Sequence, residues 1–575
     1  MNNQQISYIF REIASLLALQ GDDPFRIRAY QRAAGTLARL RESLGSVAQR
    51  RALEAIPDIG KTLAREIVEL LETGSLRYHE HLKATVPEGL LPLLHLPSLS
   101  TEQVRVLWRK HDVTSMHHLM QKYQEGCLPF DTSTLVALGK DIEVWQRHQN
   151  RMLLGVALPR ADLLVHNLAR LPLVERINIA GSLRRGADMV GDINLVMASS
   201  DPPHLIGLCA QQPEVRQVLA ATATSTVVMT SEGLRFALVA VLPQEFAPAL
   251  LHYTGSANHI TALRHLAQHR GWSLTAHGLY RLADQSCPAV VEEEDIYRLL
   301  GLPYIPPELR ENTGEIEAAV AGSLPVLVSE DDVLGDLHIH SAWGSGAHGL
   351  QEIAQTAQRM GYQYVAICDY VYSSATGRGL SAAELSKQIV AIRQLNAKLP
   401  PSFRLLAGAE VEISASGDLE IDEEVLQQLD LVVAAIHTGF KAPRNQLTRR
   451  LCKAMEHPLV HVLAHPAGRM LGKREVPSID LEAVCETAVE TQTYLEINSH
   501  VLRLDLQDTF IRHAKDLGVL LSLGSDAHSG QEMRSMRFGV YTARRGWVEP
   551  RQLLNTLPYR ELHTRLNKRD ALHVS

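Results

Sequence analysis

The run GDLHIHS at residues 335–341 is the most informative stretch of the chain, because six later runs repeat its pattern. Each run is apolar and ends in polar residues. The later runs are YVAICDY (364–370), RLLAGAEVEI (404–413), LDLVVAAIHT (429–438), VHVLAHP (460–466), TYLEINS (493–499) and VLLSLGSDAH (519–528). Helical stretches separate the runs, which predicts βα units and a mostly parallel sheet or barrel. In such a barrel the carboxyl ends of the strands meet on one face, where active sites lie.

Side chains able to bind metal stand at these predicted strand ends. They are His338, His340, Asp369, Glu410, His437, His465, Asn498, Asp526 and His528. A single histidine at a strand end is usually structural, but a set of imidazoles and carboxylates at one face suits Zn, Mn or Fe. His338 and His340, two residues apart on a strand, point to the same side and can hold one ion. A carboxylate such as Glu410 can bridge two ions. The residues therefore predict a metal-dependent phosphoesterase or a related hydrolase.

The composition excludes several other classes of protein. The 575 residues predict roughly three to five domains, and the 45% hydrophobic and 21% charged fractions are those of a globular protein. We find no apolar stretch of about 18 residues and no secretory signal, so we expect no membrane contact. The net charge of −7 confines nucleic-acid binding to local patches. Six scattered cysteines fit a reduced, cytoplasmic protein.

The first half of the chain has a different sequence pattern. Residues 1 to about 90 predict helices, and the turn Ile56-Pro57-Asp58-Ile59-Gly60-Lys61 opens one whose free N–H groups could face an anion. A related turn lies at 96–100. From about 150, β-like runs at 174–199 and 225–243 predict a mixed sheet, and a Pro-rich connector follows at 303–319.

Residues from about 335 to 550 resemble the polymerase-and-histidinol-phosphatase (PHP) domain through DLHIHS, CDY, GAEVEI, AAIHTGF, AHPAGRML and SDAHS, in that order. The resemblance implies a distorted (β/α)7 barrel. The version with HPxGR and LEIN resembles the one fused to bacterial family X DNA polymerases, which is associated with manganese-dependent 3′→5′ exonuclease activity. It implies that one metal is held by His338, His340, Glu410 and Asp526, and a second by Glu410, His437 and His465.

The chain departs from this family at a third metal position. The family usually reads SDG where this chain has Gly344-Ser345-Gly346, and Asp-His where it has Asp369-Tyr370. Ser345 and Tyr370 are poor ligands for a divalent ion, which leaves His528 alone there. We therefore expect two metals in the PHP site, Mn²⁺ or Zn²⁺, and not three.

Residues 1–320 resemble a bacterial family X polymerase along nearly their full length. The fold class we predict is multidomain α+β and α/β: a helical helix-hairpin-helix region, a nucleotidyltransferase palm with a mixed sheet, a thumb and the PHP barrel. The expected domains are a lyase-like domain at 1–90, a fingers-like domain at 91–150, the palm at 151–265, the thumb and linker at 266–322, and the PHP domain at 323–575.

The same resemblance assigns binding residues. Gly181-Ser182 and Arg185 match the signature that holds the triphosphate of an incoming deoxynucleoside triphosphate, and Tyr253 to Ser256, with Gly255, match the nucleotide-selecting turn. Gly60 and Lys61 match a hairpin turn that grips DNA phosphates. The implied partners are DNA with gaps or 3′ ends, and deoxynucleoside triphosphates.

The catalytic acids of the polymerase site are incomplete. Two-metal nucleotidyl transfer with Mg²⁺ needs three acidic groups. Here the DxD position reads Asp192-Ile193-Asn194, and the third position reads Ala237. Asp192 is the one carboxylate left, and Asn194 brings no charge. We therefore expect polymerase activity to be very weak or absent.

The DNA-binding turns are also altered. The first has Asp58 and the second Ser98 and Ser100 where the family has glycine, and a side chain there hinders close approach of backbone to phosphate. Glu66 occupies the position of the lyase lysine of eukaryotic relatives.

Three hypotheses follow. The first is a phosphoesterase that hydrolyses nucleic-acid 3′ ends at the PHP centre in DNA repair. The second is a DNA-binding scaffold whose catalytic sites both fail. The third is a small-molecule phosphatase of histidinol-phosphatase type.

Overall fold

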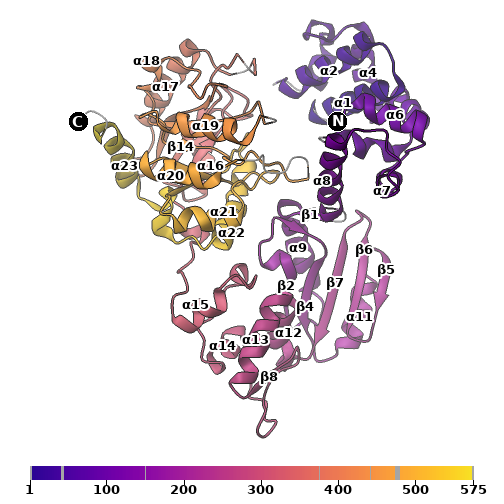
Figure 1. Cartoon of the computed structure of the whole chain (residues 1–575), viewed down its shortest axis with the longest axis vertical. Coiled ribbons are helices and arrows are strands. Elements are labelled where there is room, and N and C mark those ends of the chain that lie inside the picture. Colours follow the sequence, from indigo (N-terminus) through magenta and orange to yellow (C-terminus); the bar gives the residue numbers. More distant parts are fainter. Residues whose placement is uncertain are drawn as a thin grey trace. The chain divides into compact units, whose positions relative to one another are not determined.

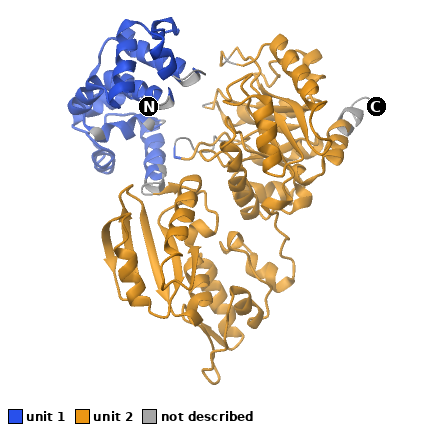
Figure 2. Cartoon of the chain, turned by 180° about the vertical axis from the view of Figure 1, so that it is seen from behind, with its two compact units in different colours: residues 1–149, 472–475 blue, residues 150–471, 476–575 orange. Residues whose placement is uncertain are grey.

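The computed structural model describes residues 3–40, 44–96, 98–148, 151–374, 376–377, 379–440, 442–472 and 479–572. The chain divides into two compact units, coloured separately in Figure 2. One comprises residues 1–149 with 472–475, and the other 150–471 with 476–575. The finer division into five domains stays a prediction.

The first unit is helical (Figure 1). Its helices are α1 (Asn3–Gln20), α2 (Pro24–Arg39), α3 (Leu44–Gln49), α4 (Lys61–Thr73), α5 (Arg77–Thr85), α6 (Thr101–His111), α7 (Met116–Gln124) and α8 (Thr132–His148). Ile6, Phe10, Ile13 and Leu17 repeat at helical spacing along α1, and all four are fully buried in the core of this unit. Burial of that stripe holds α1 against α2, α5 and α6.

Residues 152–254 of the second unit form a mixed sheet with helices. The elements are β1 (Met152–Leu153), α9 (Leu154–Leu168), β2 (Arg176–Ala180), α10 (Gly181–Arg184), β3 (Met189–Val190), β4 (Ile193–Ala198), α11 (Pro202–Ala210), β5 (Val215–Ala221), β6 (Ser225–Thr230), β7 (Arg235–Val241) and α12 (Phe246–Thr254). The main sheet has the order β2-β4-β7-β6-β5, and β4 runs parallel to β7. The mixed sheet predicted from the two β-like runs is confirmed.

A small segment follows, with α13 (Ala257–His269), the hairpin β8 (Trp272–Leu274) and β9 (Leu279–Arg281), α14 (Glu293–Leu299) and α15 (Glu315–Ala321). The fully buried Arg310 pairs with Glu293 at 2.8 Å, and Arg184 of α10 pairs with the same carboxylate at 2.6 Å. One buried carboxylate thus ties this segment to the sheet-bearing segment before it.

The C-terminal part of the second unit is a parallel barrel. Its strands are β10 (Gly335–Ile339), β11 (Tyr364–Ile367), β12 (Arg404–Glu412), β13 (Leu431–Ala435), β14 (Val462–Leu463), β15 (Tyr494–Asn498) and β16 (Leu521–Gly524). They pair in chain order, all parallel. A bridge between Ile339 and Ala527 brings β16 back to β10, so the barrel is nearly closed. The barrel predicted from the seven apolar runs is confirmed.

Helices cover the outside of this barrel. They are α16 (Leu350–Arg359), α17 (Ala382–Asn396), α18 (Glu423–Leu426), α19 (Arg444–Met455), α20 (Leu481–Glu490), α21 (Asp508–Asp516), α22 (Met536–Arg545) and α23 (Tyr559–Leu572). The amphipathic α16 buries Leu350, Ile353, Ala354 and Ala357 at helical spacing, which places its apolar face in the main barrel core.

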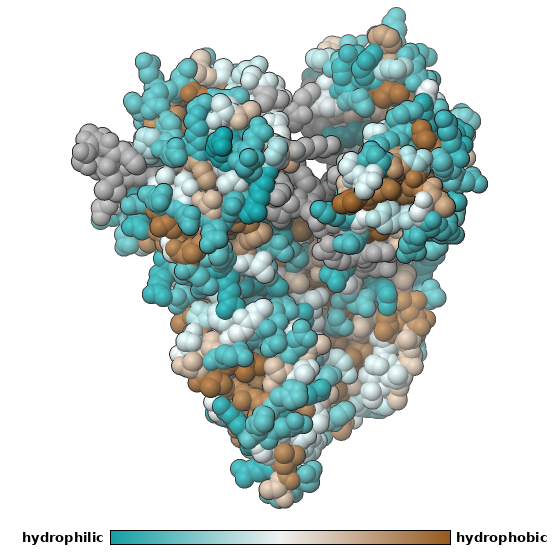
Figure 3. All heavy atoms as spheres, in the orientation of Figure 1, coloured by the Kyte–Doolittle hydropathy of each residue, from teal (hydrophilic) through white to brown (hydrophobic). Residues whose placement is uncertain are grey.

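Within the described residues, no helix is long and apolar enough to cross a membrane. Figure 3 shows one face of the molecule, on which brown hydrophobic residues lie as separate patches among teal polar ones.

Candidate metal centre and polymerase-like site

The strand ends of the barrel bring the predicted ligands together. His338 lies in β10 and Glu410 in β12, and His340, His437, His465 and Asp526 follow within two residues of the ends of β10, β13, β14 and β16. They form two groups, and within each group the ligand atoms all lie within 4.8 Å of one another. His338, His340 and Asp526 form the first group, and Glu410, His437 and His465 form the second. All six were singled out by the sequence pattern, which also selected Asp369, Asn498 and His528; among the described residues those three belong to neither group.

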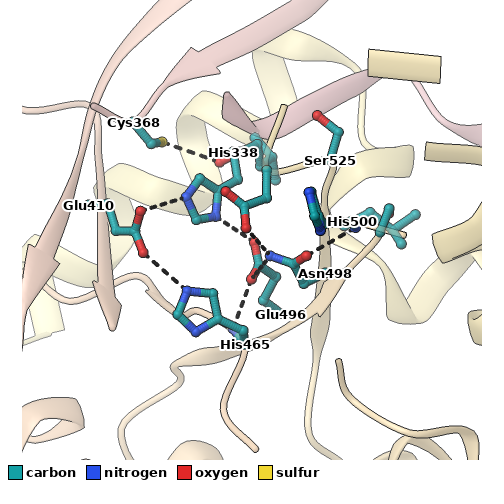
Figure 4. Close-up of polar contacts among 12 residues, drawn as sticks. His338, Cys368, Glu410, His465, Glu496, Asn498, His500 and Ser525 are labelled. Carbon is teal, nitrogen blue, oxygen red and sulfur yellow. Dashed lines mark hydrogen bonds and ion pairs between the residues drawn. The ribbon is translucent and has the colours of Figure 1, made fainter. Parts of the chain in front are cut away.

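Glu410 belongs to the second group and also faces the histidines of the first. Its Oε1 lies 3.1 Å from Nε2 of His437 and 3.1 Å from Nε2 of His465. Its Oε2 lies 3.2 Å from Nε2 of His338 and 3.5 Å from Nε2 of His340. Figure 4 shows His338 and His465 at opposite oxygens of this carboxylate. Each carboxylate oxygen therefore faces two imidazoles, an arrangement suited to a carboxylate shared by two ions.

Asp526 completes the first group. Its Oδ1 lies 3.1 Å from Nε2 of His340, and its Oδ2 accepts a hydrogen bond from Nδ2 of Asn498 at 3.2 Å. Nε of Arg503 lies 3.4 Å from the same Oδ2, with 15% of the arginine side chain exposed. A fixed cation thus stands beside the first group.

Two carboxylates that the sequence argument did not select orient the imidazoles. Glu496 accepts from Nδ1 of His338 at 2.6 Å, and Glu412 from Nδ1 of His437 at 2.6 Å. Each contact leaves Nε2 of the histidine facing Glu410, the carboxylate–histidine pattern typical of metal ligands. The two-residue periodicity of a strand could have identified both carboxylates. Glu412 lies two residues from Glu410, and Glu496 lies two residues from Asn498, so each shares a strand face with a selected residue.

The electrostatics of the centre favour charged pairs. Burial alone would lower the pKa of His338, but the nearby Glu496 and Glu410 raise it well above its usual range. Burial also opposes the charged form of His437, yet Glu410 and Glu412 raise its pKa to about 9. Burial would raise the pKa of Glu410, but His338 and His437 hold it well below its usual range. The carboxylate is therefore ionised and available to a cation.

The third position differs from these two groups. Both oxygens of Asp369 are in use, because Ser341 donates its N–H at 2.8 Å and its hydroxyl at 2.5 Å, and Nε2 of Gln388 donates at 2.6 Å. The ring of His528 packs on His340 at 4.2 Å, and burial beside His340 lowers its pKa to about 4. Among the described residues, His528 belongs to neither ligand group.

The polymerase-like site lies on β4 and β7. Asn194 and Ala237 are direct partners in the parallel register of these strands, where the sequence alignment had placed the second and third acids. Asp192 directly precedes β4, and Nε of Arg235 is 3.4 Å from its Oδ1. The carboxylate thus has a guanidinium beside it and no second acid at positions 194 or 237.

The predicted nucleotide-binding residues surround α10. Ser182 lies in α10, and Arg185 follows it, with Nε 2.9 Å from Oε1 of Glu311 and Nη1 donating to the Thr254 carbonyl at 2.7 Å. Tyr253 is 39% exposed near the end of α12, and Gly255 adopts φ +70° directly after it. Arg185 and the turn are close together, but the arginine is already paired with a carboxylate.

The predicted DNA-binding residues open α4. Gly60 caps the helix and Lys61 is its first residue, exposed to solvent. Asp58 adopts φ +63°, a conformation that favours glycine, and lies 3.3 Å from Nε of Arg32. In the second turn, the N–H of Ser98 already donates to Asp141 at 2.8 Å. Pro97 of that turn lies outside the described residues.

Comparisons with known proteins agree with this architecture. A helix-hairpin-helix domain matches residues 1–76, and the DNA polymerase beta thumb matches residues 249–311. The DNA polymerase/3′-5′ exonuclease PolX of Bacillus subtilis (strain 168) is 32% identical over 582 residues, covering 99% of this chain and all of the relative. A probable phosphatase of Syntrophotalea carbinolica is 31% identical over 230 residues, 38% of this chain and 90% of the relative. DNA polymerase lambda of Rattus norvegicus is 24% identical over 344 residues, 54% of this chain and 56% of the relative.

The fold and the site define a class: a polymerase-like chain joined to a parallel barrel whose strand ends gather two groups of side chains that could hold metal ions. The similarity to PolX extends over the full length of both proteins. The chain belongs to the bacterial family X DNA polymerases that carry a PHP domain.

Proposed function

We propose that this protein is a metal-dependent phosphoesterase that acts on DNA 3′ ends, as a 3′→5′ exonuclease, in a cytoplasmic DNA repair setting. The PHP centre is the working site. The observation that carries the proposal is the bridging position of Glu410, each of whose oxygens faces two histidine Nε2 atoms. The PolX relative, whose name includes the same exonuclease activity, supports it.

The donor set fits two divalent ions, manganese or zinc. Imidazole nitrogens and carboxylate oxygens are the ligands these metals accept. We assign one ion to His338, His340, Glu410 and Asp526, and the other to Glu410, His437 and His465. When bound, the metals supply a nucleophile of lowered pKa and neutralise the charge of the phosphate.

The chain's own residues hold this arrangement. Glu496 and Glu412 fix the histidine tautomers by accepting from Nδ1. Asn498 orients Asp526, and Arg503 places a permanent positive charge beside the same carboxylate. Glu412, Glu496 and Asn498 are buried strand residues, so the fold itself holds the side chains that orient the ligands.

We further propose that polymerase activity is very weak or lost. Asn194 and Ala237, adjacent in register, provide no charge for Mg²⁺ beside Asp192. The Arg185 side chain is paired with Glu311 and not free for a triphosphate. A nucleotide would bind at Ser182, Tyr253 and Gly255 only if the ion pair between Arg185 and Glu311 opened.

Metal analysis and substrate competition test the proposal. We expect about two metal ions per chain and loss of hydrolysis on chelation. A labelled DNA 3′ end should compete far better than histidinol phosphate. Hydrolysis that persists in the chelated protein would refute the metal assignment, and a preference for histidinol phosphate would favour a small-molecule phosphatase.

A further inference from the structure

His437 is the most exposed of the four histidines in the two ligand groups. Its side chain is 21% exposed, whereas the side chains of His338, His340 and His465 are at most 1% exposed. It lies two residues beyond the end of β13. The surrounding core therefore encloses this ligand less completely than the others, and the direction of its ring depends more on polar contacts.

Glu412, the last residue of β12, supplies two of these contacts. Its Oε2 accepts from Nδ1 of His437 at 2.6 Å, and its Oε1 accepts from the backbone N–H of His437 at 3.2 Å. One carboxylate thus fixes both the ring and the backbone of the histidine. In this position Nε2 of His437 lies 3.1 Å from Oε1 of Glu410.

Arg450 of α19 lies on the other side of Glu412. Its Nη2 is 3.2 Å from Oε1 of Glu412, and its Nη1 donates to the carbonyl of Thr438 at 2.7 Å. Its Nε donates to the carbonyl of Ile413 at 3.0 Å. Because Ile413 follows Glu412 and Thr438 follows His437, one guanidinium joins the chain just beyond β12 to the chain just beyond β13. The contacts form a closed ring that includes His437.

The position of Arg450 is costly for a charged side chain. It is 6% exposed, on a helix that buries Leu447 and Leu451 in the barrel core. A buried charge is tolerated when it is paired and hydrogen-bonded, and here the partners are one carboxylate and two carbonyls. The planar fork of a guanidinium can meet three such acceptors at once, whereas a lysine ammonium is a single point charge.

The turn after His437 is shaped around this guanidinium. Gly439 adopts φ +81°, and a Cβ at this position would lie 3.0 Å from Nη1 of Arg450. A glycine therefore lets the backbone pass close to the arginine.

The contacts of Arg450 are confined to this side of the centre. Within the described residues it makes no hydrogen bond to His338, His340 or Asp526, the ligands of the first group. The carboxylate that orients His338 is Glu496, which belongs to β15. Removal of Arg450 therefore acts on the second group and leaves the contacts of the first in place.

We propose that Arg450 is a positioning residue that keeps His437 directed at Glu410, through Glu412 and the Thr438 carbonyl, and so sets the affinity of the second metal group and not of the first. Without the guanidinium, Glu412 loses a cationic partner and the Thr438 carbonyl loses its donor. This inference rests on the proposed function, which assigns one ion to each group.

The test compares Arg450→Met, Arg450→Lys and, as the matched control, Arg449→Met, all in the full chain. Arg449 is the neighbouring arginine of α19 and is exposed to solvent. Each metal-free protein is titrated with Mn²⁺ by calorimetry. His437→Ala is titrated in parallel, because the binding event that it removes identifies the ion of the second group. Denaturant unfolding of the metal-free proteins shows whether each variant is folded.

We expect Arg450→Met to weaken the second ion by about 10- to 100-fold, the usual effect of removing a group that orients a metal ligand. The first ion should bind as in the wild-type protein. Arg450→Lys, which keeps the charge beside Glu412, should lose less affinity for the second ion than Arg450→Met. Arg449→Met should behave as wild type. Hydrolysis of DNA by Arg450→Met should recover when Mn²⁺ is raised about 100-fold, because mass action refills a weakened site.

Wild-type affinity for the second ion in folded Arg450→Met would overturn the proposal. An equal loss for both ions would also overturn it, because Arg450 would then support the barrel in general. If Arg450→Met does not fold, Arg450→Lys decides by the same comparison of the two ions. Failure of the proposed function looks different: the wild-type protein would bind two ions and hydrolyse no DNA, and the titrations would still decide the role of Arg450.

Discussion

Replacing Glu496 by Gln should weaken manganese binding at the PHP centre by about 10- to 100-fold, the usual effect of removing a partner that orients a metal ligand. One oxygen of Glu496 accepts from Nδ1 of His338 at 2.6 Å, and the other from the N–H of His465 at 2.8 Å and from Nδ2 of Asn498 at 3.1 Å. Glutamine has the same shape but a single oxygen, so at least one of these donors loses its acceptor.

The expected magnitude agrees with a separate argument. A buried donor left without a partner costs about 1–3 kcal/mol, and a 10- to 100-fold loss of affinity corresponds to about 1.4–2.7 kcal/mol. The assay is calorimetric titration of the metal-free protein with Mn²⁺. The matched control is Glu423→Gln, because Glu423 also pairs with a histidine, His457 at 3.1 Å, but is 53% exposed and away from the ligand groups. Wild-type affinity in Glu496→Gln would refute the reasoning.

Further predictions concern the ligands, the palm and the DNA-binding turn. His437→Ala should abolish hydrolysis, because it removes a ligand of the second group; unchanged activity would refute the assignment. The metal-free protein should lose stability as pH rises from about 6.5 through the raised His437 pKa of about 9, because the protonated imidazole that pairs with Glu410 and Glu412 is lost. Denaturant unfolding measures this stability, and a free energy of unfolding that does not change over that pH range would contradict the pairing. Asn194→Asp with Ala237→Asp should raise primer extension with Mg²⁺, and no gain would show that the acids are misplaced. Asp58→Gly should tighten DNA binding in an anisotropy titration by a few-fold, since it removes one negative charge from the turn. Equal affinity of the variant and the wild-type protein would show that Asp58 does not weaken DNA binding.

The barrel could be predicted from sequence because its signal is local. Each of the seven runs carries its own apolar stretch and its own polar end, and parallel pairing in chain order then needs no further information. The helical stripe of α1 is local in the same sense. The two ligand groups follow from the barrel, since strand ends at one face bring His338 and Asp526 together across 188 positions.

Contacts between distant side chains could not be predicted in this way. Gln388 reaches Asp369 from α17, and Glu311 pairs with Arg185 across 126 positions. No strand periodicity of two residues and no helical periodicity of 3.6 residues in the sequence indicates that either pair of residues is in contact. Glu412 and Glu496 share strand faces with selected residues, but which histidine each one holds depends on the shear of neighbouring strands.

The contacts around Arg185 bear on the polymerase half as well. Arg545 of α22 donates both to the Arg185 carbonyl at 3.0 Å and to Oε1 of Glu311 at 2.8 Å. Arg469, four residues after His465, pairs with Asp188 at 3.0 Å. The loop that resembles a triphosphate site is therefore held at both ends by residues of the barrel.

The most direct test of the central claim is a single gel. A 5′-labelled primer on a gapped template is incubated with the full chain and Mn²⁺, with and without deoxynucleoside triphosphates. The account predicts shortening of the primer in both lanes and no extension. Extension of the primer, or an unchanged primer with about two metal ions confirmed per chain, would contradict it.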